Sequence, residues 1–84
     1  MIQHHKHHDG TFVLHKITLN GHKYSCWYGR DGKPFSAERI SRDDRTTYHV
    51  DLSRQHEVAR QLGRIGRPYV ERVDTTGRVV ESNA

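Results

Sequence analysis

The densest group of residues able to do chemistry lies near the N-terminus, where Asp9 follows the histidines His4, His5, His7 and His8. Imidazoles at this density can bind Zn²⁺, Ni²⁺ or Cu²⁺. A structural zinc site, however, normally draws spaced ligands from a turn and a second element, and this stretch lacks such spacing. The sequence therefore favours a solvated arm with opportunistic metal affinity, and we assign no metal ligand and no cofactor. A physiological metal site and a tag-like segment are the alternatives.

Cys26, the single cysteine of the chain, is the residue whose type most suggests nucleophilic chemistry. If Asn20-Gly21 forms a two-residue hairpin turn, His15 lies opposite Cys26. A cysteine nucleophile needs a lowered pKa and a cleft for its substrate, and the sequence indicates neither. A cysteine in the middle of a strand is more often a packed core residue. Since the sequence also contains no nucleophile elbow or phosphate loop, we expect the protein not to be an enzyme.

Basic side chains are the more informative group. Fourteen Lys and Arg against ten Asp and Glu give a net charge of +4, and arginine supplies most of the positive charge. The planar guanidinium donates two parallel hydrogen bonds to a phosphate or a carboxylate. A basic patch is the usual footprint of nucleic-acid binding, although ordinary small proteins share a mild basic excess. The residues that we expect to bind nucleic acid or a partner are Lys16, Lys23, Trp27, Arg30, Lys33, Arg60, Arg64 and Arg67.

Five of these residues are expected on or beside one face of a sheet. The hairpin register places Lys16, Lys23 and Trp27 on its outer face, with Arg30 and Lys33 at the adjoining turn. Cations around an exposed aromatic ring can meet phosphates while the ring stacks on a base. In the alternative interpretation, Trp27 and Leu14 pack under the N-terminal arm or against a second copy, and the lysines are merely solvated. The exposure of Trp27 decides between them.

A helix must carry the remaining three arginines. The sequence predicts a helix over about residues 52–65, with Asp51 or Ser53 as its N-cap and Gly66 as a left-handed C-cap. Its apolar stripe consists of Val58, Leu62 and Ile65. Arg60, Arg64 and Arg67 are expected on the opposite side, where they either follow phosphates or form an ordinary solvated face.

The strands that accompany this helix indicate a small α+β fold. An antiparallel three-stranded meander is expected over residues 12–40, with turns at 20–21 and 30–32, and it packs against the helix. One or two further strands are expected. Residues 46–50 can supply one, and residues 69–80 predict a C-terminal hairpin or a single edge strand.

Within this hairpin, a continuous register places Ile17 opposite Tyr24 and Val13 opposite Tyr28, both on the apolar face. With 84 residues, the chain has room for one domain. We expect this domain over residues 11–81, after a flexible His-rich arm at 1–10 and before a frayed tail at 82–84.

The expected function is a small basic nucleic-acid-binding or regulatory module that acts through its Lys/Arg/Trp surface on DNA or RNA. The alternative is a protein-interaction accessory factor, an inhibitor or an adaptor, that docks on an acidic partner. A homodimer is also compatible with the sequence. The chain has no apolar run of the roughly 20 residues that span a bilayer and no signal-peptide pattern. Together with the single cysteine, this favours a cytoplasmic protein without membrane partners.

Overall fold

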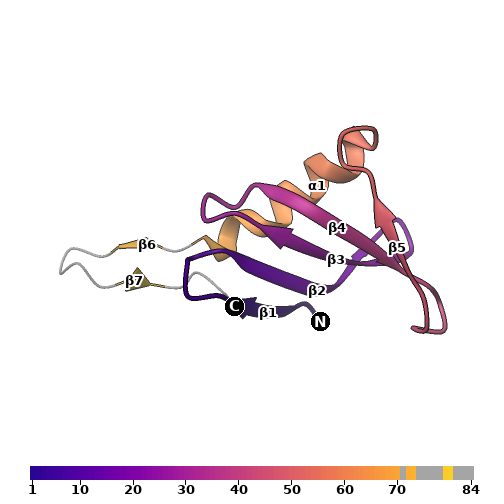
Figure 1. Ribbon diagram of the computed structural model, residues 1–84, viewed down its shortest axis with the longest axis horizontal. Coiled ribbons are helices and arrows are strands. Elements are labelled where there is room, and N and C mark those ends of the chain that lie inside the picture. The colour runs from indigo at the N-terminus through magenta and orange to yellow at the C-terminus, as the bar shows by residue number, and fades with distance from the viewer. Residues whose placement is uncertain (71, 74–78, 81–84) are drawn as a thin grey trace.

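A computed structural model describes residues 1–70, 72–73 and 79–80. Its main feature is an antiparallel sheet of five strands in the order β1-β2-β3-β4-β5 (Figure 1). The strands are β1 (Gln3–Lys6), β2 (Phe12–Leu19), β3 (His22–Tyr28), β4 (Pro34–Ile40) and β5 (Thr47–Val50). Within this sheet, each of the strands β1 to β4 pairs with the next strand in the chain. The α+β prediction is confirmed: the meander over residues 12–40 gains two further strands and contacts one helix.

The N-terminal stretch corrects one expectation. Residues 1–10 were expected to be a flexible arm, but β1 pairs with β2 from Gln3 opposite His15 to Lys6 opposite Phe12. Alternate side chains of this strand face the core, so that Ile2 and His4 are half-buried while Gln3 and His5 are exposed. The edge of His4 meets the Phe12 ring at 5.6 Å between centroids. A polar, His-rich stretch can therefore serve as an edge strand, because only one of its faces touches the core.

The turn between β2 and β3 forms as the sequence predicts. Asn20 and Gly21 have φ values of 51° and 80°, both in the left-handed region that a type I′ turn requires. Thr18 pairs with Lys23 and Ile17 with Tyr24, in agreement with the expected register.

Beyond Ile17 the expected register is wrong. The pairing shifts by one residue between Leu14 and Ile17, where His15 and Lys16 form a β-bulge. Leu14 therefore lies opposite Cys26 in the core, and Val13 lies opposite Trp27 on the other face. The predicted pair of His15 with Cys26 does not form.

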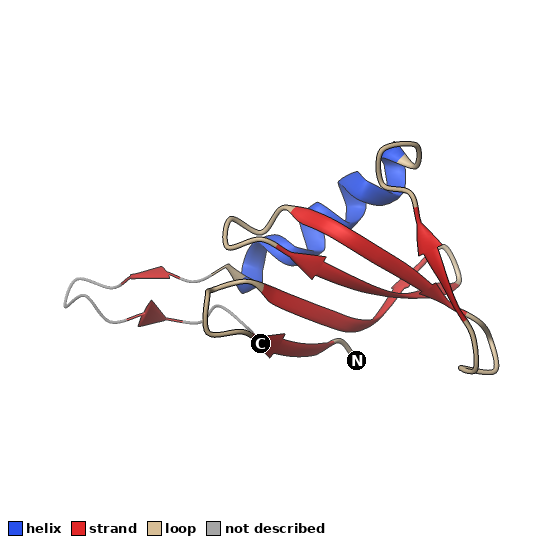
Figure 2. Ribbon diagram, in the orientation of Figure 1, coloured by secondary structure: helices blue, strands red, loops and turns tan. Residues whose placement is uncertain are grey.

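Helix α1 (His56–Gly66) packs on one face of the sheet and continues into a 3₁₀ turn at Arg67–Tyr69 (Figure 2). Leu62 is fully buried, and Val58 and Ile65 pack beside it, so the predicted apolar stripe is confirmed. The core between helix and sheet consists of Phe12, Leu14, Ile17, Leu19, Tyr24, Cys26, Tyr28, Ala37, Val50 and Leu62.

Both ends of α1 differ from the prediction. The N-cap is Gln55, not Asp51 or Ser53, and it forms no side-chain cap hydrogen bond. Asp51 instead accepts hydrogen bonds from the Ser53 N–H and hydroxyl in the preceding turn, which lowers the pKa of its carboxyl. Gly66 has φ −74°, so it is helical and not a left-handed cap.

The C-terminal hairpin is present as β6 (Arg72–Val73) paired with β7 (Val79–Val80). The turn expected between these two strands and the tail at 82–84 lie outside the described residues. Over the part of the chain that the structure describes, no helix is long and apolar enough to cross a membrane.

Candidate functional site

The structure divides the predicted binding residues between two surfaces. Lys16, Lys23 and Trp27 belong to the open face, which we define as the face of the five-stranded sheet directed away from α1. Lys33 belongs with the helix arginines in a groove between α1 and the β3–β4 turn, which we call the helix–turn groove. The groove is lined by Asp31, Gly32, Lys33, Pro34, Arg60, Gly63, Arg64 and Arg67.

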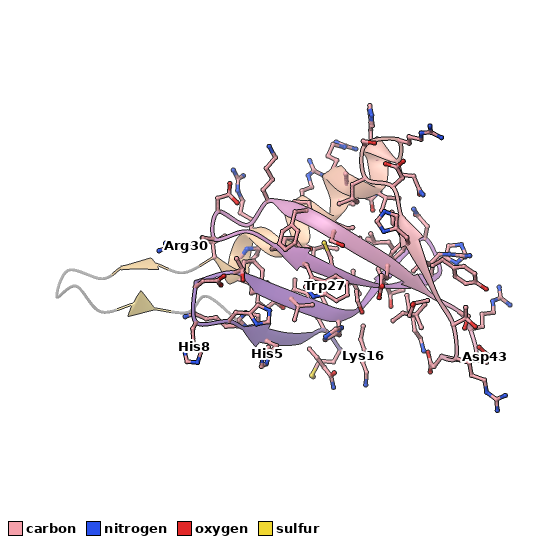
Figure 3. The ribbon with its side chains drawn as sticks, viewed as in Figure 1. His5, His8, Lys16, Trp27, Arg30 and Asp43 are labelled. Carbon is pink, nitrogen blue, oxygen red and sulfur yellow. The ribbon has the colours of Figure 1, made fainter. Side chains whose placement is uncertain are left out.

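The open face holds a broad depression of about 640 Å³ near the β2 bulge. Lys16, at φ 62°, and His15 both line it, because the bulge turns two successive side chains to this side. Ser25 lies in the same depression, only 5% exposed, and its Oγ is hydrogen-bonded to His15 Nδ1 at 2.8 Å. In Figure 3, Lys16 projects away from the strand. The bulge therefore contributes two neighbouring side chains to the lining of this depression.

Trp27 does not form the open stacking platform that the sequence suggested. It is half-buried, and its ring meets His15 edge-on with 6.0 Å between ring centroids. Lys23 lies four residues away along β3, and its Nζ is 3.4 Å from a carboxylate oxygen of Asp44. Because Trp27 is half-buried, the open face is less suited to base stacking than its sequence predicts.

The helix–turn groove is more strongly cationic. It has a volume of about 310 Å³ and brings Lys33 together with Arg60, Arg64 and Arg67, against one acidic residue, Asp31. In the described part of the chain, no carboxylate is ion-paired with Lys33, Arg64 or Arg67. These three side chains are exposed.

Arg60 is the partly neutralised member of the groove. Its Nη2 donates to both carboxylate oxygens of Glu57, at 2.7 and 3.0 Å. Together with a hydrogen bond from Gln61, this contact lowers the pKa of Glu57. An exposed pair of this kind is weak, so an incoming anion can compete for Arg60.

Arg30 belongs to neither surface. Its side chain lies over Gly10, where an added Cβ would come within 2.7 Å of Arg30 Nε. Gly10 has φ 91°, so the β1–β2 turn depends on glycine both for its backbone and for the space that Arg30 occupies. The position of Arg30 therefore indicates a role in packing the β1–β2 turn against the β3–β4 turn.

Cys26 lies in the core and is fully buried. Burial raises the pKa of its thiol to about 11, which keeps it protonated at neutral pH. With Leu14 opposite it in place of His15, no base is aligned with the sulfur across the β2–β3 pair.

The histidines of the N-terminal stretch are spread over both sides of β1. His5 and His7 come together, with 5.2 Å between ring centroids. Among the residues that the structure describes, no group of three His, Cys, Asp or Glu is arranged to hold a metal ion.

A third group of side chains lies at the opposite end of β3 and β4, where the predicted Lys23 and three residues not predicted from the sequence, His22, Arg39 and Arg42, line a small cavity. The period-2 alternation of β4 places Arg39 on the same face as Ala37, and this signal was available once β4 was predicted.

Comparison with known proteins found no family model, no curated protein and no solved structure that matches the chain.

Proposed function

We propose that this protein is a small nucleic-acid-binding module and that its helix–turn groove contacts the phosphate backbone. One observation supports this most: a single groove collects Lys33, Arg60, Arg64 and Arg67, from two segments far apart in the sequence. Neutralising backbone phosphates with Lys and Arg releases counterions and supplies most of non-specific nucleic-acid affinity.

The arrangement of the arginines suits a repeating ligand. Positions 60, 64 and 67 follow one another at about one helical turn, or roughly 5.4 Å along the axis. Each guanidinium can donate two parallel hydrogen bonds to one phosphate. A backbone that lies along α1 would therefore meet successive cations, with Lys33 closing the groove from the turn.

A protein-interaction function is the second candidate, and exposed aromatic side chains favour it. Phe35 is 63% exposed and Tyr48 is 47% exposed. Aromatic residues and arginine are enriched where protein interfaces gain most of their affinity. An acidic partner would use the same cationic groove, so direct binding measurements must separate the two candidates.

The test is fluorescence anisotropy with labelled single-stranded DNA, duplex DNA and RNA over a range of salt concentrations. Replacing Arg64 by Gln should weaken binding about tenfold at low salt, because it removes one charge-assisted hydrogen-bonding group. For a single strand, the slope of log K against log salt should become shallower by about 0.7.

The matched control is Arg54→Gln, which removes the same charge from a side chain that is 87% exposed and lies outside the groove. It should keep the wild-type slope. Equal effects of the Arg64 and Arg54 substitutions would contradict the groove as the binding site. Absence of binding to all three nucleic acids at about 50 mM salt would refute the function and leave the protein-interaction candidate.

A further inference from the structure

A small cationic cavity lies at the end of the sheet away from the helix–turn groove. It has a volume of about 160 Å³ and is lined by Gly21, His22, Lys23, Arg39 and Arg42, among others. These residues come from the β2–β3 turn and from the end of β4. Since β3 and β4 run between the two sites, about 20 Å of strand separates them. None of its cations lines the helix–turn groove.

Arg39 is held in place inside this cavity. Its Nη1 donates a hydrogen bond to Nδ1 of His22 at 3.2 Å, and its guanidinium lies 5.2 Å from the centroid of the Tyr48 ring. The residue is half-buried, and no carboxylate among the described residues pairs with it. A guanidinium that is held without a carboxylate keeps its full charge and the donors that His22 does not use.

Arg42 is the second cation of this space. It is exposed and makes no ion pair within the described residues. Lys23 also contributes to the lining, but its side chain belongs to the open face, where its Nζ lies 3.4 Å from Asp44. The cavity is therefore lined by two arginines and no carboxylate. A cavity of about 160 Å³ has room for one tetrahedral oxyanion.

From these contacts we infer that the cavity binds a phosphate group, held by Arg39 and Arg42. The group has two sources: free inorganic phosphate, or a phosphate at the end of a nucleic-acid strand. This inference goes beyond the proposed function, because it uses different side chains and does not require a polymer.

Calorimetric titration with inorganic phosphate, at ionic strength held constant with NaCl, tests the site. Arg39→Gln and Arg42→Gln should each lower the affinity about tenfold or more, because each removes a charged donor. Arg42 is an exposed loop residue, so its variant should keep the wild-type Tm even if the Arg39 variant is destabilised. Arg54→Gln, again the matched control, should bind phosphate as the wild type does.

Comparison of 5′-phosphorylated with 5′-hydroxyl oligonucleotides distinguishes the two sources. A preference for the phosphorylated end that disappears in the Arg42 variant identifies a terminal phosphate, whereas equal binding of both oligonucleotides identifies the free ion. The inference is overturned if the wild type shows no saturable heat with phosphate. It is also overturned if Arg64→Gln, in the helix–turn groove, abolishes that heat while Arg42→Gln does not. Failure of oligonucleotide binding alone would refute only the proposed function.

Discussion

Gly66 is the last residue of α1, close to the end that the sequence predicts, but the physical reason for a glycine at this position differs from the predicted one. The sequence suggested a glycine that ends the helix in a left-handed conformation, whereas Gly66 keeps helical angles. Its lack of a side chain serves packing, because an added Cβ would overlap the ring of Tyr28. The hydroxyl of the same tyrosine donates to the Leu62 carbonyl oxygen at 2.7 Å. A contact between residues this distant in sequence leaves no local pattern, so only the tertiary structure reveals it.

Because the Tyr28 ring packs against Gly66, alanine substitutions at Gly66 and at Gly63 should have opposite effects on the stability of the protein. Gly66→Ala should destabilise the protein by about 1–3 kcal/mol, because the ring of Tyr28 has to move. Gly63→Ala places its Cβ 3.7 Å from Pro34 Cδ, an ordinary contact, and should stabilise the helix by up to about 1 kcal/mol. Urea unfolding followed by circular dichroism measures both changes. Equal destabilisation by the two substitutions would contradict the assigned packing.

At the scale of the element, strand β2 explains why one half of the hairpin register could be predicted and the other half could not. The Asn20-Gly21 turn sets the pairing as far as Ile17. Phe12 and Leu14 occupy even positions, whereas Ile17 and Leu19 occupy odd ones, and all four are buried. Strict alternation cannot bury both pairs on one face, so an extra residue is required between them. The switch of the apolar residues from even to odd positions within β2 is the feature of the sequence that indicates the bulge.

The bulge yields a prediction about deletions. Removing Lys16 restores regular alternation, keeps every core residue facing the core and removes a residue with φ 62°. The variant should fold cooperatively, with stability within about 1–2 kcal/mol of wild type, because left-handed strain is relieved as the bulge is lost. Removing Thr18 instead turns Leu19 out of the core and should cost about 1.5–3 kcal/mol.

Thermal unfolding of the two deletion variants, followed by circular dichroism, checks this difference. A Lys16 deletion at least as damaging as the Thr18 deletion would show that the bulge is needed for folding and not only for shaping the open face.

At the scale of the whole molecule, the helix–turn groove depends on how α1 crosses the end of the sheet. The helical period placed Arg60, Arg64 and Arg67 on one side of the helix from sequence alone. It could not place Lys33 beside them, because that neighbour depends on the direction of α1 over the β3–β4 turn. The same packing places Lys33 with the helix arginines and leaves Lys16 and Lys23 on the open face. The sequence thus indicated the correct residue types but not which of them act together.

The most direct test of the proposed function is a residue-resolved titration of the ¹⁵N-labelled protein with a short single-stranded oligonucleotide, followed by two-dimensional NMR. We expect the largest amide shifts at Lys33, Gly63, Arg64 and Arg67, and their loss as salt is raised from about 50 to 200 mM. Shifts concentrated at Ser25 and Trp27 on the open face would contradict the groove as the nucleic-acid site, and a spectrum unchanged by the oligonucleotide would contradict nucleic-acid binding itself.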